Sequence, residues 1–231
     1  VMSRENSIAE FYSLLAELRA KTGFRYLKDC RASLGWPKQG VYFFFEEGET
    51  RQGSNDMRVI RVGTHGLKTG SNTTLWGRLR KHRGTIGGEL GGGGNHRGSI
   101  FRLHVGTALI NKENLNVPTW AQGNNAGPDI RAREHFLECK VSQVIGNMPF
   151  LWLKVEDPSG PQSLRGYIER NAISLLSNYM REPIDPPSEN WLGNYCANSM
   201  VRESGLWNVD HVQSYCDPVF IGELTYLIRK M

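Results

Sequence analysis

Apolar and polar residues alternate along the first half of this chain in a way that predicts two strands and a helix. An almost uninterrupted apolar run, Gly40–Phe45, and a second mainly apolar run, Arg58–His65, have the length and the aromatic and β-branched content of strands. The polar, glycine-bearing segment Glu46–Asp56 predicts an enlarged hairpin loop between them. Leucines four residues apart then predict a helix over Thr73–Gly84, capped by its threonines.

The opening segment has the pattern of an amphipathic helix. Ser7 and Glu10 have the spacing of a capping box, and Gly23 supplies a stop. The apolar residues that recur at helical spacing are Ile8, Phe11, Tyr12, Leu15 and Leu18. We expect this helix to pack on the sheet or on a second subunit.

Glycine is densest in the segment Gly84–Gly98. A nucleotide-binding phosphate loop needs Gly-Lys-Ser/Thr at the start of a helix, and this segment lacks it. It instead runs into Ser99–Gly106, whose apolar residues predict a strand. A flap over a nucleic-acid groove, with His96 and Arg97 at its base, and a mobile linker are both compatible with the glycine content.

The second half of the chain predicts alternating helices and one strand. A helix begins at Pro128, a strand covers Met148–Asp157, a helix follows Pro161, and a closing helix covers Pro218–Ile228. The residues expected in the core of the C-terminal third are Trp191, Trp207, Val209 and Val212.

Three adjacent polar residues in the first of these helices invite comparison with a metal site. Glu134, His135 and Glu138 do not have the HExxH spacing of metalloproteases. We therefore expect them to form a solvated helix face.

These elements predict a mixed α/β (α+β) fold, with a small, mainly antiparallel sheet flanked by helices. At 231 residues the chain has the length of one well-buried domain. We expect a core over about 38–180, a helical extension over 1–36 and a helical subdomain over 183–231.

Composition favours an anionic partner inside the cell. Lys and Arg number 28 against 23 Asp and Glu, a formal net charge of +5, which suits a polyanion such as DNA. The four cysteines are scattered without metal-ligand spacing, so we expect free thiols and a cytoplasmic location. No apolar run has the length of a membrane span, so we expect no membrane contact.

Candidate chemistry lies on the first two predicted strands and the helix after them. Tyr42 interrupts an apolar strand, and Arg78 and His82 lie four residues apart on one helix face. A phenol, a guanidinium and an imidazole on neighbouring rigid elements are suited to a phosphodiester site.

This arrangement resembles the GIY-YIG nuclease family, in particular its restriction-endonuclease branch. Gly40-Val41-Tyr42 corresponds to the first triad, and Arg61-Val62-Gly63 to the second. Arg78 with His82 corresponds to the pair on the catalytic helix. The second triad has Arg61 where the family usually has tyrosine, and the stretch between the triads is longer than the family's usual spacer.

The resemblance implies further site residues. Glu169, on the helix after the last core strand, corresponds to the glutamate that ligates a divalent metal, Mg²⁺ or Mn²⁺. An asparagine often lies beyond it, for which Asn178 and Asn190 are both candidates. Gly63, His65 and Asn178 are candidates for substrate binding. The alternative for Glu169 is a surface residue paired with Arg165 at i−4.

We therefore expect a Mg²⁺-dependent endonuclease of double-stranded DNA, of the sequence-specific restriction type. Arg78 would bind phosphate and Glu169 the metal. A phenol is a poor base at neutral pH, so Tyr42 would need nearby positive charge, for example Arg61. His82 would accept a proton or hold the phenol's hydrogen bond. A DNA-binding protein on a decayed nuclease scaffold and a repair or mobile-element nuclease stay as alternatives, and a homodimer stays open.

Overall fold

A four-stranded antiparallel sheet in the order β1-β4-β2-β3 forms the centre of the molecule. The structure is a computed structural model that describes residues 3–231. The strands are β1 (Arg25–Tyr26), β2 (Gly40–Thr50), β3 (Met57–Gly63) and β4 (Pro149–Lys154). The expected mixed α/β fold with an antiparallel sheet and flanking helices is confirmed.

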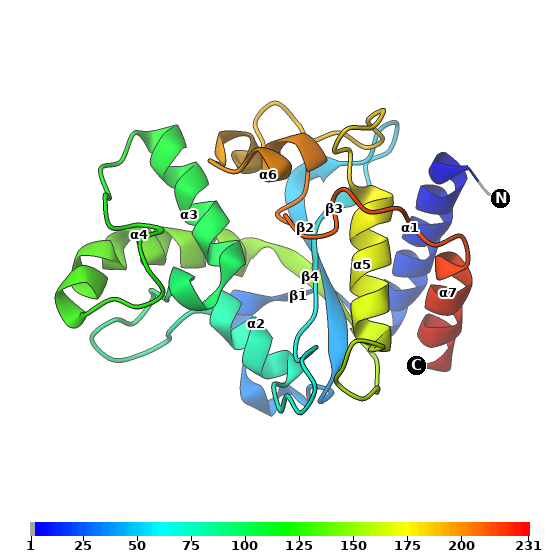
Figure 1. Cartoon of the computed structure of the whole chain (residues 1–231), viewed down its shortest axis with the longest axis horizontal. Helices are drawn as coiled ribbons and strands as arrows, with labels where there is room; N and C mark the ends of the chain where they lie inside the picture. Colours follow the sequence, from blue (N-terminus) through cyan, green and yellow to red (C-terminus); the bar gives the residue numbers. More distant parts are fainter. Residues whose placement is uncertain (1–2) are drawn as a thin grey trace.

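Helices cover both faces of this sheet (Figure 1). One face carries α1 (Arg4–Thr22), α5 (Leu164–Leu176) and α7 (Phe220–Lys230). The other carries α2 (Leu75–Arg83), α3 (Ile100–Glu113) and α4 (Pro128–Asn147). The short α6 (Ser199–Ser204) and four 3-10 turns, Leu27–Asp29, Ala32–Leu34, His96–Gly98 and Leu192–Tyr195, complete the described chain.

Strand β2 is buried on both sides, which explains its almost continuous apolar sequence. Val41 and Phe43 pack toward α1 and α5, in the first of two core clusters. Tyr42 and Phe44 pack toward α2 and α3, in the second. The sheet therefore directs the Tyr42 side chain toward α2.

The outer edge of β3 is covered by a segment from the C-terminal third. The Trp207 amide donates to the Ile60 carbonyl at 2.7 Å. The Asn208 side chain both accepts from the Val62 amide and donates to the Val62 carbonyl, at 3.1 and 2.8 Å. These contacts satisfy the backbone groups that an edge strand leaves unpaired. Of the residues expected in this part of the core, Trp191, Trp207 and Val212 are fully buried and Val209 is partly buried.

Several predicted boundaries shift by a few residues. Helix α1 begins at Arg4 and is capped by Ser3, which accepts from the Asn6 amide, so the capping box at Ser7 was wrong. Helix α2 is capped by Thr74, one of the two expected residues. Strand β2 continues to Thr50, so the hairpin loop is shorter than expected.

The strand predicted for Ser99–Gly106 was wrong, because this segment begins helix α3. Phe101, Leu103 and Val105 alternate as in a strand, but the polar residues between them are not on a solvent face. Arg102 and His104 are buried with Phe101 and Val105, so the buried positions follow a helical period.

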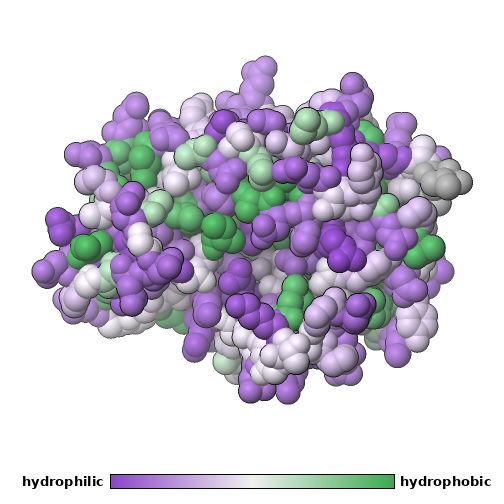
Figure 2. All heavy atoms as spheres, in the orientation of Figure 1, coloured by the Kyte–Doolittle hydropathy of each residue, from purple (hydrophilic) through white to green (hydrophobic). Residues whose placement is uncertain are grey.

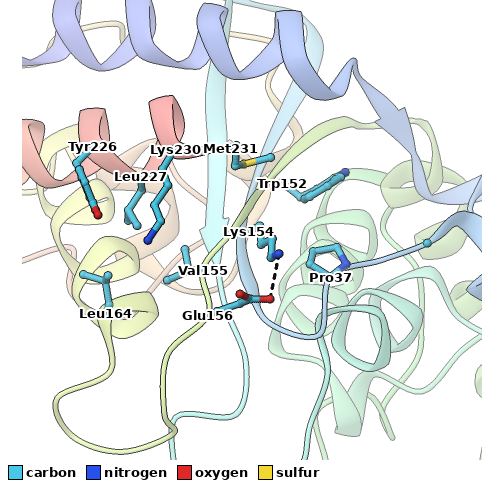
Figure 3. A pocket seen from close by; sticks show the side chains of 11 residues that line it. Pro37, Trp152, Lys154, Val155, Glu156, Leu164, Tyr226, Leu227, Lys230 and Met231 are labelled. Carbon is cyan, nitrogen blue, oxygen red and sulfur yellow. Dashed lines mark ion pairs between the residues drawn. The ribbon is translucent and has the colours of Figure 1, made fainter.

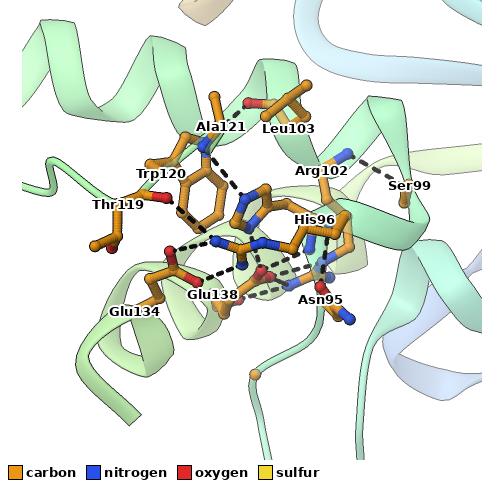
Figure 4. Close-up of polar contacts among 12 residues, drawn as sticks. Asn95, His96, Ser99, Arg102, Leu103, Thr119, Trp120, Ala121, Glu134 and Glu138 are labelled. Atoms are coloured by element: carbon orange, nitrogen blue, oxygen red, sulfur yellow. Dashed lines mark hydrogen bonds and ion pairs between the residues drawn. The ribbon is translucent and has the colours of Figure 1, made fainter. Parts of the chain in front are cut away.

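The solvated face predicted for Glu134 and Glu138 was also wrong. Both are buried, at 2% and 3% exposure, because each carboxylate binds an arginine (Figure 4). Glu134 pairs with Arg97 at 2.6 Å and Glu138 with Arg102 at 2.5 Å. His96 adds a contact at 2.9 Å to Glu138. Two carboxylates thus join helix α4 to the glycine-rich segment and α3.

The end of the glycine-rich segment is packed rather than loose. A Cβ atom at Gly94 would lie 2.3 Å from the guanidinium carbon of Arg102, so a larger residue there would displace the buried arginine. The Thr85 amide donates to the Gly93 carbonyl at 2.8 Å and the Gly92 amide donates to the Thr85 carbonyl at 2.9 Å. Neither a free flap nor a mobile linker describes this part of the segment.

The face shown in Figure 2 is predominantly hydrophilic, and apolar side chains appear there in small, separate groups. In the part of the chain that the structure describes, no helix combines the length and the apolar character needed to cross a bilayer. The four cysteines are free thiols, as expected.

Candidate active site

Tyr42 and His82 form a buried hydrogen-bonded pair between β2 and α2. The Tyr42 hydroxyl lies 2.8 Å from His82 Nε2, and neither residue has exposed surface. Burial lowers the pKa of His82 well below its usual value, and the nearby positive charge of Arg78 lowers it further. The imidazole is therefore neutral near pH 7. Gly63 lies opposite Tyr42 on β3, and a Cβ atom there would be 2.3 Å from the phenol oxygen.

Ser99, the N-cap residue of α3, and Arg102 within this helix hold His82 in place. Ser99 Oγ lies 2.8 Å from His82 Nδ1, and the guanidinium of Arg102 donates to the His82 carbonyl at 2.8 Å. Sequence reasoning missed both, because it assigned this segment to a strand. Arg102 is itself held by the buried pair with Glu138, so this pair helps to fix the position of the His82 backbone.

Arg61 lies on the same face of the sheet as Tyr42. It pairs with Phe44 across β2, is 4% exposed, donates to the Trp207 carbonyl, and stacks 4.7 Å from the centre of the Phe101 ring. Burial lowers the pKa of Arg61, while interaction with the Tyr42 hydroxyl and with Glu169 opposes that shift. The role expected for Arg61, to supply positive charge near the phenol, requires a side chain that is turned toward Tyr42.

Glu169 approaches this group from helix α5. Its Oε1 accepts a hydrogen bond from the Thr64 amide at 3.0 Å, at the end of β3. Burial raises the pKa of Glu169, and the charges of Arg61 and Arg78 partly offset this effect. The alternative pairing of Glu169 with Arg165 does not form, because Arg165 binds Asp157 at 2.5 Å.

Arg78 is the cation of the group that is least committed to other contacts. It is partly buried on α2, and its Nε atom has no hydrogen-bond partner within residues 3–231. Its charge affects the pKa values of both His82 and Glu169, so its guanidinium lies near both.

His65 follows β3 and lies beside this group. Its Nδ1 is 2.9 Å from the Thr73 carbonyl, just before α2, and Arg165 donates to the His65 carbonyl at 2.9 Å. Burial lowers the pKa of His65 to about 4, and the charges of Arg165 and Arg78 contribute to the shift. Its Nε2 atom has no partner in the described part of the chain.

The two candidate asparagines lie apart from this group. Asn178 Oδ1 accepts hydrogen bonds from Arg4 and from the Ile184 amide, both at 3.0 Å, beyond the far end of α5. Asn190 is exposed in the C-terminal third. The structure therefore brings together Tyr42, Arg61, Arg78, His82, Glu169, Gly63 and His65, and it places the asparagines elsewhere.

Two residues near the group had no signal in the sequence. The charge of Asp210 contributes to the raised pKa of Glu169. His104, on α3, lies near Arg61, and burial lowers its pKa to about 4. Both are distant from the motifs in sequence, so only the fold brings them close.

Glu169 is the carboxylate available for a metal. Within residues 3–231 no three His, Cys, Asp or Glu side chains gather as a metal cluster. A single carboxylate still fits Mg²⁺, which keeps several waters and takes its other ligands from substrate phosphate. Burial raises the pKa of Glu169, so a metal ion bound there would have to compete with a proton for the carboxylate.

A separate pocket of about 560 Å³ lies beside α7 and β4 (Figure 3). Tyr226, Leu227 and Lys230 line one side, and Trp152 and Pro37 line the other. No residue of the group around Tyr42 lines it. This pocket is therefore not part of the candidate site.

Comparison with known proteins gives one match. The family model described as the GIY-YIG domain matches residues 2–231, a range that extends beyond the core expected over about 38–180. No curated protein and no solved structure matches the chain.

Proposed function

We propose that this chain, which belongs to the GIY-YIG domain family, is an endonuclease. It would hydrolyse double-stranded DNA with the help of a divalent metal ion. The observation that carries the proposal is the convergence of five side chains from four elements, β2, β3, α2 and α5. These side chains are Tyr42, Arg61, Arg78, His82 and Glu169. Family membership supports a nuclease, and this convergence supports a phosphodiester as its substrate.

Arg78 is proposed to bind a non-bridging oxygen of the scissile phosphate. Its Nε atom is buried without a hydrogen-bond partner among residues 3–231 and its charge acts on Glu169, so the guanidinium has donors that could bind an anionic oxygen. A planar guanidinium does this through two parallel donors, which a lysine cannot provide. Its main effect is on the charge that develops in the transition state.

Glu169 is proposed to hold Mg²⁺ or Mn²⁺. When bound, such an ion neutralises phosphate charge and stabilises the leaving oxygen. The hydrogen bond from the Thr64 amide fixes the other side of the carboxylate, so Glu169 is held in one orientation.

Tyr42 is proposed to act as general base or to position the attacking water. Arg61, beside its hydroxyl, supplies the positive charge that a phenol needs for this role, and His82 holds its hydrogen bond. The hydroxyl is covered in this structure, so this role requires that DNA binding brings the water into contact with it.

A restriction-type enzyme is the form of nuclease that we favour. The Arg78 and His82 pair resembles that branch of the family, and the added helices around the sheet give material for sequence recognition. The alternatives are a DNA-binding protein without activity, favoured by Arg61 in place of a tyrosine, and a repair or mobile-element nuclease.

Incubation of supercoiled plasmid with the protein and Mg²⁺ or Mn²⁺ tests the proposal. We expect linear or nicked DNA with wild-type protein. Glu169→Ala should lower the cleavage rate about a hundredfold or more. The same variant should lose metal binding in calorimetry and keep its affinity for DNA, since a carboxylate facing phosphate is removed.

Glu223→Ala is the matched control, because Glu223 is an exposed glutamate on α7. It should cleave as the wild type does. Normal cleavage by Glu169→Ala would remove the metal assignment. DNA binding by the wild type without cleavage under any of these conditions would favour the inactive DNA-binding alternative.

A further inference from the structure

The ring nitrogens of His65 have different surroundings, and these fix the position of its proton. Nδ1 lies 2.9 Å from the Thr73 carbonyl oxygen. A carbonyl oxygen only accepts hydrogen bonds, so Nδ1 must carry the hydrogen and donate it. A neutral imidazole has one such hydrogen, which leaves Nε2 with a free lone pair.

The imidazole is neutral in its surroundings. The charged groups that face it are Arg165, Arg78 and Asp157, of which two are cations that disfavour a second proton. Together with burial they hold the pKa of His65 at about 4. Near pH 7 the Nε2 lone pair is therefore present in almost every molecule.

This lone pair has no donor to bind. Nε2 is buried without a hydrogen-bond partner among residues 3–231, and the His65 residue is 5% exposed. Buried polar atoms in proteins are nearly always paired, so an unpaired acceptor at this place points to a ligand that supplies the donor.

The position of His65 suggests which ligand that is. The residue before it, Thr64, binds Glu169 through its amide, and Thr73, which binds its ring, lies five residues before Arg78. The charge of Arg78 contributes to the lowered pKa of His65, so the imidazole lies near the guanidinium assigned to the phosphate, and the neighbouring Thr64 binds the carboxylate assigned to the metal. A water that attacks this phosphate lies beside it, in line with the leaving oxygen and on the opposite side of phosphorus.

We propose that His65 Nε2 accepts a hydrogen bond from the attacking water and so orients its lone pair toward phosphorus. This role rests on the nuclease function proposed above and adds a catalytic residue to it. In this contact an O–H group of the water donates to Nε2, which has no donor in the protein without substrate. No proton transfer to His65 is required, since the hydrogen bond alone fixes the direction of attack.

Two amide variants separate the two nitrogens. His65→Asn places an amide nitrogen where Nδ1 lies, so it keeps the donor to Thr73 and has no atom at Nε2. His65→Gln extends an amide to the Nε2 position and gives up the Thr73 contact. We expect His65→Asn to melt close to the wild-type temperature, to bind a mixed-sequence duplex with unchanged Kd, and to cleave plasmid about a hundredfold more slowly. His65→Gln should melt lower and cleave faster than His65→Asn.

Cleavage by His65→Asn at the wild-type rate would overturn the proposal and leave the nuclease in place. A wild-type protein that cleaves nothing would instead contradict the proposed function. The tautomer is checked separately by nitrogen NMR of histidine-labelled protein near pH 7. Nε2 should be unprotonated, and a signal from His65 with the hydrogen on Nε2 would also overturn the proposal.

Discussion

Arg78 and Arg80 are two residues apart on α2 and have different surroundings. Successive residues of a helix turn by about 100°, so these side chains lie on nearly opposite sides. Arg78 is partly buried and lies near Glu169 and His82, whereas Arg80 is exposed. The same substitution at the two positions therefore tests which side of the helix meets the scissile phosphate.

Arg78→Lys should lower kcat for plasmid cleavage about a hundredfold with a small change in DNA affinity, because lysine keeps the charge and loses the bidentate geometry. Steady-state kinetics and a binding titration separate these effects. Arg80→Lys is the matched control and should cleave normally. If Arg80→Lys is the damaging change and Arg78→Lys is silent, the helix has been assigned the wrong face.

Glu46 gives a prediction of stability against pH. Burial raises its pKa to about 7, and the nearby charge of Glu49 adds to the shift. Because the folded-state pKa lies above the unfolded value, the folded protein binds more protons between the two values. Its stability therefore falls as pH rises through this window, and the full penalty is present above about pH 7.

Glu46→Gln should remove this penalty and keep an acceptor for Trp191 Nε1, which lies 3.2 Å from the carboxylate. We expect the variant to be more stable than wild type by about 1–2 kcal/mol at about pH 8, and to show little difference at about pH 4. Urea unfolding at the two pH values measures this. Glu47→Gln, at the exposed neighbouring residue, should give the same difference from wild type at both pH values.

At the scale of elements, helices α3 and α4 are joined by a buried charge pair. Arg102 donates to Glu138 through Nε and Nη2, and Glu138 also accepts from the His96 amide at 2.6 Å. Burial alone would raise the pKa of Glu138, but hydrogen bonds from His96 and the charge of Arg102 outweigh it and lower the pKa. The carboxylate is therefore ionised and bound on several sides.

Glu138→Ala should destabilise the protein by about 3–5 kcal/mol, because it leaves the fully buried Arg102 without its counter-charge. Thermal or urea unfolding measures the loss. Glu113→Ala is the control, since it breaks a pair with Lys140 whose side chains are 36% and 43% exposed. That pair should contribute at most about 1 kcal/mol. Equal losses in both variants would contradict a structural role for the buried pair.

The elements that the sequence predicted correctly are those whose apolar residues recur with the period of the element. The runs around Gly40–Phe45 and Met148–Asp157 and the helix after Pro128 have apolar positions that match their burial. Helix α3 was misread because Arg102 and His104 are buried polar residues, which a pattern of hydrophobicity counts as exposed. The partner of Arg102, Glu138, lies on α4, and no local pattern reports such a distant contact.

In the candidate site, too, the residues with a motif were predicted and those that depend on distant contacts were not. Tyr42, Arg78, His82 and Glu169 were predicted from motif order and are brought together by the fold. Ser99, His104 and Asp210 had no motif, since each depends on a segment far away in the chain. The asparagine expected after Glu169 was inferred from the family resemblance, and of its two candidates Asn178 binds Arg4 on α1 and Asn190 is exposed.

At the scale of the whole molecule, a groove lined by basic residues lies beside the C-terminal end of α2. Arg80, Lys81 and Arg83 line it together with glycines and Asn95 of the glycine-rich segment. Arg83 is held by the Cys30 carbonyl at 2.6 Å and by the Trp76 ring, so Arg80 and Lys81 are the exposed cations. These two cations lie at the end of α2, outside the candidate site. Their charge is suited to contact with DNA phosphates on either side of the one that is cleaved.

The double variant Arg80→Ala/Lys81→Ala should weaken binding of duplexes of any sequence, because phosphate contacts do not read bases. The slope of log Kd against log salt should fall by about one to two. Lys154→Ala/Lys230→Ala removes equal charge beside the pocket in Figure 3 and is the matched control. An unchanged salt slope in the first variant would exclude the groove from DNA binding.

The cover on the edge of β3 also bears on the order in which the site is assembled during synthesis. Arg61 and Val62 bind Trp207 and Asn208, which follow them by 146 residues. A ribosome therefore releases the motif strands, α2 and Glu169 well before the segment that binds Arg61 and covers the strand. Until that segment emerges, Arg61 lacks its carbonyl partner and β3 has an open edge. The nascent chain thus contains the residues of the site before the site is complete, and assembly waits until Trp207 and Asn208 have left the ribosome.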